Sequence, residues 1–239
     1  MTDPVSNGRW VCVDVGETII DETRIWSVWA DVVGISRLTL MAALGAVIAR
    51  GGEHGTVFDV FGIPEPDWRG LVPVVEERYG GFQEADLYPD ARPTLAALHE
   101  AGYRVAVIAN QPARRTAELR ALGVSPEVMA MSDELGVAKP SPAFFTSALQ
   151  LMGDPQPGEV AYVGDRVDND VLPSLAAGMR AVWIRRGPWG AIQAPPADRQ
   201  PALIVDSLTE LTERIEEAFA GLQAVSVSGG AGSRPLPSR

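Results

Sequence analysis

The pattern that most restricts this fold is a series of short apolar runs that alternate with segments of helical periodicity. The runs lie at residues 10–13, 103–109, 128–131, 160–163 and 181–184, with a weaker one at 203–205. Continuous apolar runs of this length are typical of strands that are buried on both faces of a parallel sheet. Parallel strands that are separated by helices need right-handed crossovers. The sequence therefore predicts a three-layer α/β fold around a parallel sheet.

A long helical segment interrupts this alternation. After Thr18 no strand pattern appears before Tyr103, and apolar residues recur there at helical spacing in three runs. A single crossover between strands needs only about a dozen residues and one helix. We therefore expect residues 19–88 to form an all-helical cap domain, inserted into a core that is made of residues 1–18 and 89–222.

Composition narrows the classes of function. The net charge of −11 argues against nucleic acid as a partner, because phosphate binding needs clustered basic side chains. Cys12 is the single cysteine, so no disulfide framework is possible, and we expect a buried, inert thiol. A signal-peptide pattern and long apolar stretches are lacking, which predicts a cytoplasmic protein without a membrane partner. Residues 223–239, rich in Ser, Gly and Pro, are predicted to be a disordered tail, and the oligomeric state has no sequence signal.

Polar residues with useful chemistry follow the predicted strands. Asp14, Asn110, Lys139, Asp165 and Asp170 all fall at or shortly after a strand end. The carboxyl ends of parallel strands meet at one edge of a sheet, which is where ligands bind. Lys139 is the only lysine among 20 basic residues, and arginine cannot replace a compact ammonium group. Carboxylates that converge beside a single lysine repel one another, so we expect a divalent cation, with Mg²⁺ favoured.

Several other side chains allow two interpretations. Four residues early in the helical segment could face the active site and select a substrate: Arg24, Trp26, Trp29 and Arg37. The two tryptophans could equally pack in the core of the segment. His54 and His99 are isolated and lie away from the strand ends. We expect neither histidine to bind a metal or to act in a catalytic triad.

The order and spacing of these residues resemble the haloacid dehalogenase-like (HAD) hydrolase superfamily. The first motif of that family, Asp-x-Asp-x-Thr, is similar to Asp14-Val15-Gly16-Glu17-Thr18. The second, at a strand end, falls at Ala109-Asn110-Gln111, and the third is similar to Lys139-Pro140. The fourth, Gly-Asp-x-x-x-x-Asp, is met from Gly164 to Asp170. The resemblance covers nearly the whole chain except the tail, and it implies a Rossmann-like core with an inserted helical cap.

The resemblance implies hydrolysis of a small phosphorylated metabolite in two steps. Asp14 would attack phosphorus to form an aspartyl-phosphate, which water would then hydrolyse. Lys139 would orient Asp14 and offset charge on the phosphoryl oxygens. By the same resemblance, Mg²⁺ would be held by Asp14, the main-chain carbonyl of Gly16, Asp165 and, directly or indirectly, Asp170, and the phosphoryl group would meet Lys139, Asn110 and Gln111.

Two positions depart from the family pattern. Gly16 stands where the family has its general acid/base aspartate, a loss that typically costs about 10²–10⁴-fold in rate. Ala109 stands where a Ser or Thr contacts the phosphoryl group, a loss of about 10²–10³-fold. The leaving group could need no proton, as in acyl, enol or aryl phosphates, or a cap residue or Glu17 could supply one. Glu17 is otherwise expected to be a solvated turn residue. A third explanation is a catalytically impaired relative that binds a phosphorylated ligand as a sensor or scaffold.

Other reactions of the superfamily match the sequence less well. Enzymes that dehalogenate 2-haloacids also lack the second aspartate, but they carry an aromatic residue at the position of Gly16 and a serine at that of Ala109. Dehalogenation is therefore a weaker alternative. Phosphonate cleavage uses a cap lysine, and residues 19–88 contain none. Phosphomutases keep the acid/base aspartate that this chain lacks.

Overall fold

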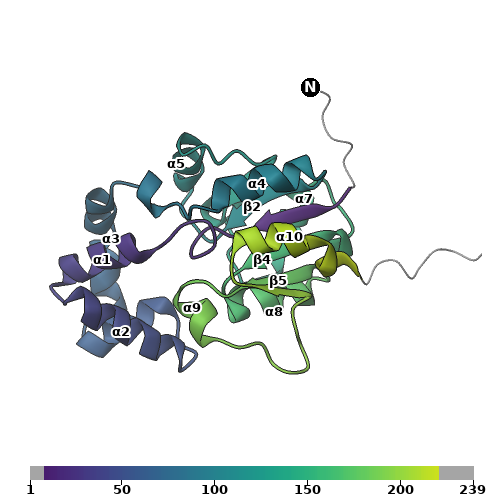
Figure 1. The fold of residues 1–239 in the computed structure, drawn as a ribbon. Coiled ribbons are helices and arrows are strands. Elements are labelled where there is room, and N and C mark those ends of the chain that lie inside the picture. The colour runs from purple at the N-terminus through teal and green to yellow at the C-terminus, as the bar shows by residue number, and fades with distance from the viewer. Residues whose placement is uncertain (1–7, 221–239) are drawn as a thin grey trace, which may run out of the picture.

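The computed structural model describes residues 8–220 and shows a parallel sheet between two layers of helices (Figure 1). Six strands lie in the order β3-β2-β1-β4-β5-β6, and every neighbouring pair is parallel. The predicted three-layer, Rossmann-like fold is confirmed, and each strand begins and ends within one residue of its expected position. The strands are β1 (Trp10–Val13), β2 (Arg104–Ala109), β3 (Val128–Met131), β4 (Val160–Gly164), β5 (Arg180–Ile184) and β6 (Leu203–Val205).

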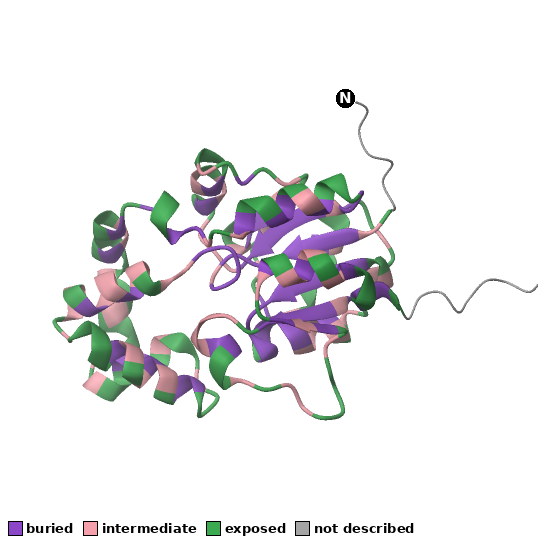
Figure 2. Cartoon of the chain, in the orientation of Figure 1, coloured by how far each residue is buried: buried purple, intermediate pink, exposed green. Residues whose placement is uncertain are grey.

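Helices cover both faces of the sheet, and the strands between them are buried along their length (Figure 2). Helices α4, α5 and α10 contribute to the apolar cluster on one face, and α7 packs on the other. The helices that follow β2 are α5 (Arg115–Ala121), α6 (Ser132–Leu135), α7 (Pro142–Leu151), α8 (Leu172–Ala176), α9 (Gly187–Ile192) and α10 (Leu208–Phe219), and α4 (Ala91–Glu100) precedes that strand.

The residues of strand β1 pack alternately against the helices on the two faces of the sheet. Val11 and Val13 pack into the cluster beneath α4 and α10, while Trp10 and Cys12 pack into the cluster beneath α7. Successive side chains of a strand point to opposite faces, so a strand that is covered on both sides must be apolar throughout. The Cys12 thiol is free and buried, as expected.

The segment between β1 and β2 is helical. It holds α1 (Thr23–Val33), α2 (Arg37–Ile48) and α3 (Glu65–Tyr79), together with the short helices η1 (His54–Phe61) and η2 (Glu84–Asp86). Helices α1 to α3, which we call the helical segment, lie beside the sheet on the side to which β1 points (Figure 1). They share an apolar cluster of their own, which Trp189 of α9 joins. The domain boundaries at 18/19 and 88/89 stay a proposal, and the tail at 223–239 lies outside the described residues.

Two helix starts differ from what the local sequence favours, since Pro112 suits the first turn of a helix and Asp90 suits an N-cap. The helix after β2 begins at Arg115 rather than near Pro112, because i→i+3 turn bonds, such as that from the Arg115 N–H to the Pro112 carbonyl, precede it. Asp90 does not cap α4. Its carboxylate instead accepts hydrogen bonds from Arg186 and from the Leu208 N–H at the start of α10. The Asp90 carboxylate thus binds partners that are distant in the chain rather than the first turn of its own helix.

Within residues 8–220, no single helix is both long and apolar enough to cross a membrane. Helices α1 and α2 pass that test only when taken together, and the two are bent by 112°. The cytoplasmic location stays a prediction.

Candidate active site

Three buried carboxylates meet at the centre of the sheet edge. Asp14 directly follows β1, the strand that lies between β2 and β4, and its N–H donates to the Val163 carbonyl at 2.9 Å. Asp165 follows β4, and Asp170 lies one turn further along. One carboxylate oxygen from each of Asp14, Asp165 and Asp170 lies within 4.8 Å of the other two. The parallel topology therefore brings together residues that are separated by some hundred and fifty positions in the chain.

Lys139 joins two of these carboxylates. Its Nζ lies 2.7 Å from Asp14 Oδ1 and 2.6 Å from Asp170 Oδ1. Burial alone would lower the pKa of Lys139, but the charges of Asp14 and Asp170 and their hydrogen bonds raise it above the ordinary value. The side chain stays an ammonium group and fixes the orientation of the Asp14 carboxylate.

Asn110 holds the backbone of Lys139 in place. Its Oδ1 accepts the Lys139 N–H at 2.8 Å, and its Nδ2 donates to the Lys139 carbonyl at 2.9 Å. The amide expected to meet a phosphoryl group is thus engaged in positioning the lysine. Gln111 lies beside it, with Nε2 3.5 Å from Glu22 Oε1, and both amides line the cavity described below.

Asp165 lacks a cationic partner among the ion pairs of the described chain. Burial, and then the charges of Asp170 and Asp14, raise the pKa of Asp165 well above its ordinary value. Burial also raises the pKa of Asp170 to about 6, although Lys139 opposes the shift. Lys139 alone does not balance three carboxylates. A hard, oxygen-seeking cation such as Mg²⁺ fits this donor set.

The glycine of the fourth motif is required by packing. A Cβ on Gly164 would lie 2.4 Å from Asp170 Cγ, so any larger residue would displace that carboxylate. Asp170 Oδ2 accepts the Arg166 N–H at 2.9 Å, and the chain then forms a single π-helical turn, η4 (Val167–Val171). Because the end of the strand and this turn lie so close together, the Asp170 carboxylate can reach Lys139.

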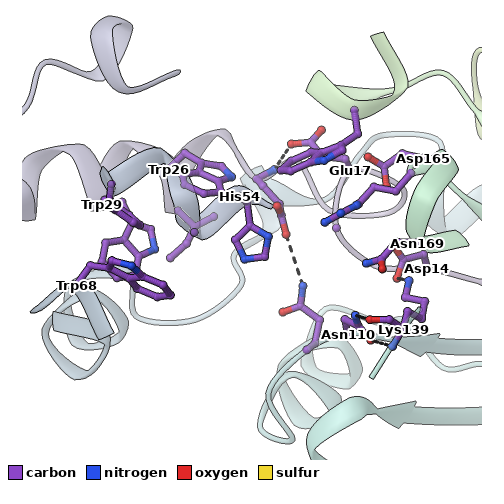
Figure 3. Close-up of a pocket in the computed structure, with 18 residues that line it drawn as sticks. Asp14, Glu17, Trp26, Trp29, His54, Trp68, Asn110, Lys139, Asp165 and Asn169 are labelled. Carbon is purple, nitrogen blue, oxygen red and sulfur yellow. Dashed lines mark hydrogen bonds and ion pairs between the residues drawn. The ribbon is translucent and has the colours of Figure 1, made fainter. Parts of the chain in front are cut away.

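A cavity of about 280 Å³ opens beside the carboxylates (Figure 3). Asp14, Lys139 and Asp165 line one side of it, and Trp26, Trp29 and Trp68 lie on the side away from them (Figure 3). We call the large aromatic side chains that line the cavity the aromatic wall; they are Trp26, Trp29, Phe58, Trp68 and Trp189.

Of the side chains in the helical segment that could select a substrate, some line the cavity and others do not. Trp26 and Trp29 line the cavity, but Arg24 does not, because it binds the Asp86 carboxylate. Arg37 instead forms an exposed pair with Asp31.

His54 lines the cavity, although in the sequence it lies away from the predicted strand ends. Its ring centroid is 6.1 Å from that of Trp26 and 6.3 Å from that of Trp189. Sequence gave no signal for this position, because the partner rings come from α1 and α9.

Glu17 is buried, so the expectation of a solvated turn residue was wrong. Its carboxylate accepts hydrogen bonds from Tyr88 Oη at 2.7 Å and from the Glu22 N–H at 3.0 Å. Burial raises the pKa of Glu17, with these hydrogen bonds acting in the opposite direction. Gly187 makes room for it, because a Cβ there would lie 2.5 Å from the Glu17 side chain.

Glu22 is the residue that sequence analysis missed. It stands at the start of α1 and lines the cavity together with Asp14. Burial, then the charges of Glu17 and Asp14, raise the pKa of Glu22 to about 7. Nothing in the sequence separates this glutamate from one that lies in the first turn of any helix.

Comparison with known proteins agrees with this geometry. The model of the haloacid dehalogenase-like hydrolase family matches residues 9–178. The chain belongs to this family. It is therefore a hydrolase, as the four motifs indicated.

Several curated relatives are named phosphatases. The chain is 35% identical over 177 residues to the glyceraldehyde 3-phosphate phosphatase of Methanopyrus kandleri, covering 70% of this chain and 74% of that one. It is 32% identical over 168 residues to the phosphoglycolate phosphatase of Pseudomonas fluorescens, covering 69% and 58% respectively.

Solved structures show the same fold. A HAD phosphatase from Thermococcus onnurineus superposes with a TM-score of 0.58 at 23% identity, covering 87% of this chain and 97% of that one. An L-2-haloacid dehalogenase from Xanthobacter autotrophicus gives a TM-score of 0.64 at 16% identity, covering 87% and 98%. The same architecture thus serves two reactions, so the choice of reaction depends on the site residues.

Proposed function

We propose that this protein hydrolyses small phosphate monoesters in a Mg²⁺-dependent reaction in which Asp14 is the nucleophile. The observation that carries the proposal is the placement of the Asp14 carboxylate. It lies at the centre of the sheet edge, 2.7 Å from the Lys139 ammonium group and within 4.8 Å of two further carboxylates. It also faces a cavity that can hold a small ester.

The donor set supports Mg²⁺. Asp14, Asp165 and the main-chain carbonyl of Gly16 would hold the ion directly. Asp170 already accepts hydrogen bonds on both oxygens, from Lys139 and from the Arg166 N–H, so we assign it to holding the lysine behind the metal. When bound, the cation would offset the charge of the carboxylates and of the phosphoryl oxygens.

The residues of the chain itself perform the chemistry. Asp14 attacks phosphorus, the ester P–O bond breaks, and the phosphoryl group is carried as an aspartyl-phosphate. Water then attacks phosphorus and releases phosphate and the free carboxylate. Lys139 keeps the nucleophile aligned and stabilises negative charge that develops on the phosphoryl oxygens. The helical segment acts as a cap whose aromatic wall faces the leaving group.

Phosphate release from a panel of sugar phosphates, acetyl phosphate and p-nitrophenyl phosphate tests this proposal. We expect turnover with Mg²⁺, loss of turnover with a chelator, and loss in Asp14→Asn. The matched control is Asp31→Asn, which removes an exposed carboxylate that pairs with Arg37. If the wild type releases no more phosphate than Asp14→Asn, the phosphatase proposal is wrong, and a binding role without turnover takes its place.

A further inference from the structure

Gly16, which stands where the family carries its general acid/base, faces another carboxyl group directly. A Cβ built on Gly16 would lie 2.4 Å from Glu22 Oε1 and 2.9 Å from Glu22 Cδ. Real side chains do not approach so closely, so a residue larger than glycine at position 16 would require the Glu22 carboxyl to leave its observed position. The Glu22 carboxyl therefore fills the volume that a side chain at position 16 would use.

The backbone around Glu22 is fixed by buried neighbours. The Glu22 N–H donates to Glu17 Oε1 at 3.0 Å, and Tyr88 holds the other oxygen of Glu17 at 2.7 Å. Both Glu17 oxygens are thus engaged in supporting the loop. The Glu22 carboxyl meets Gln111 Nε2 at the long distance of 3.5 Å and lines the same cavity as Asp14. Of the two glutamates, Glu22 is the one placed to act on a bound ester.

We propose that Glu22 is the general acid and base of this enzyme, in the place left by the glycine at position 16. The assignment rests on the proposed phosphatase function. In the first step Asp14 forms a bond to phosphorus, the ester P–O bond breaks, and the Glu22 carboxyl gives its proton to the departing oxygen. In the second step the Glu22 carboxylate takes a proton from water as that water attacks phosphorus, and the P–O bond to Asp14 breaks.

Two substrates of similar shape test the acid role. The leaving group of p-nitrophenyl phosphate is a stable phenolate. The leaving group of p-nitrobenzyl phosphate is an alkoxide, which needs a proton. For Glu22→Gln we expect a burst of one nitrophenol per enzyme followed by slow turnover, because phosphorylation proceeds but water is no longer activated. With p-nitrobenzyl phosphate we expect no burst, and a rate lowered by about 10²–10⁴-fold. The matched control is Glu77→Gln on the exposed face of α3, for which both substrates should behave as in the wild type.

Moving the carboxylate back to position 16 tests the geometry. Gly16→Asp alone should not increase activity, because its side chain meets Glu22. Glu22→Ala should be impaired in the same way as Glu22→Gln. The double variant Gly16→Asp/Glu22→Ala should be more active toward p-nitrobenzyl phosphate than Glu22→Ala. The Glu22→Ala change frees the space, and the Gly16→Asp change supplies a carboxyl group to fill it.

These outcomes separate the two proposals. A wild type that shows no Mg²⁺-dependent phosphate release contradicts the phosphatase function itself. If the wild type is active and Glu22→Gln equals it on both substrates, Glu22 is not the acid/base. A double variant no better than Glu22→Ala, although folded by circular dichroism, also overturns the assignment.

A separate observation, the aromatic wall, indicates the class of leaving group. The ring centroids of Trp29 and Phe58 are 4.9 Å apart, and those of Phe58 and Trp68 are 5.4 Å apart. All three rings line the cavity and give it an apolar surface, and Figure 3 shows Trp29 and Trp68 on the side away from Asp14 and Lys139. Such a surface favours flat, apolar groups.

The charges around the cavity also bear on the class of leaving group. The lysine and arginine side chains that line it are Lys139 and Arg166. His54 lines it as well, but burial lowers the pKa of its imidazole, which favours the neutral form. Lys139 pairs with the nucleophile and Asp170, and Arg166 lies 2.7 Å from Asp168 and 3.3 Å from Glu53. No lining cation of the described chain is left for a second anionic group. We infer that the substrate, within the proposed function, is a phosphate monoester of an uncharged alcohol that carries an apolar ring.

Relative kcat/KM values test this substrate class. Benzyl phosphate should exceed phosphoglycolate, whose carboxylate finds no cation, by roughly tenfold or more. Trp29→Ala should raise KM for benzyl phosphate with little change for acetyl phosphate, which has no ring, and Trp29→Phe, which keeps a ring, should raise it less. The control is Leu38→Ala at an exposed position of α2, for which KM should stay at the wild-type value. Equal or better turnover of phosphoglycolate would overturn the inference while leaving the phosphatase function intact.

Discussion

Asn110 and Lys139 are joined by two hydrogen bonds that run in opposite directions. The Asn110 amide accepts the Lys139 N–H and donates to the Lys139 carbonyl, so one side chain at the end of β2 satisfies both backbone groups of that lysine. This arrangement resembles the pairing between two strands. It fixes the point from which the lysine side chain reaches Asp14.

Asn110→Ala should therefore impair catalysis more than substrate binding. Loss of both bonds frees the Lys139 backbone, and displacement of a catalytic group by about 1 Å costs about 10²-fold in rate. We expect kcat for p-nitrophenyl phosphate to fall by about that factor, with a smaller change in KM. The partial control is Asn110→Asp, which keeps the acceptor and loses the donor. A wild-type kcat in Asn110→Ala would show that the lysine needs no such support.

Asp165 should lower the stability of the metal-free protein. Its pKa is raised in the folded state, so its ionised form is less favourable there than in the unfolded chain, and at neutral pH that difference opposes folding. Asp165→Asn should thus raise Tm in the presence of a chelator. The variant should also lose the increase in Tm that Mg²⁺ gives the wild type, since binding to the native state stabilises it by mass action. Thermal unfolding of both proteins with Mg²⁺ and with chelator measures the two effects; a Mg²⁺ shift that survives the substitution would exclude Asp165 as a ligand.

Asp86 should contribute stability that depends on pH. Burial alone would raise its pKa, but hydrogen bonds from Arg24 and the Gln83 N–H lower it below the ordinary value. The contribution is therefore present above the ordinary aspartate pKa and is lost as the pH falls through the lowered one. We expect Asp86→Asn to lower the free energy of unfolding at pH 7 by about 1–3 kcal/mol and to reduce its loss in acid. Denaturant unfolding from pH 7 to pH 3 gives both values.

The exposed pair of Asp31 and Arg37 is the control for Asp86. Asp31→Asn should change the free energy of unfolding by at most about 1 kcal/mol, because solvent screens such pairs. Equal effects of Asp31→Asn and Asp86→Asn would mean that burial of the Arg24 pair contributes nothing.

Gly164→Ala should disturb the site through Asp170. The added methyl group would meet Asp170 Cγ at 2.4 Å, and overpacking of this kind costs about 1–3 kcal/mol. Activity should fall as well, because Asp170 holds Lys139. Gly70→Ala is a matched control in α3, where an added Cβ meets nothing within 4 Å. It should stabilise the helix by up to about 1 kcal/mol and leave kcat unchanged. Chemical unfolding together with steady-state rates distinguishes the two glycines.

The strands and the residues that follow them could be predicted from sequence because their signals are local. A strand such as β1 is covered on both faces, so its burial appears directly as a continuous apolar run, and Asp14 marks where that run ends. The convergence of Asp14, Asp165 and Asp170 then follows from parallel pairing, which places all carboxyl ends at one edge. Lys139 was predictable for the same reason, as the single lysine in a recognisable position.

Only the tertiary structure decided which side chains occupy the space around those residues. Gly16 indicated a missing carboxylate, but the replacement comes from Glu22 at the start of a helix, a position without any pattern of its own. Likewise, the rings of His54 and Trp189 meet across segments that lie more than a hundred residues apart in the chain. Local periodicity reports whether a residue is buried, whereas the choice of neighbour depends on how separate elements pack, and that information is not local to any stretch of sequence.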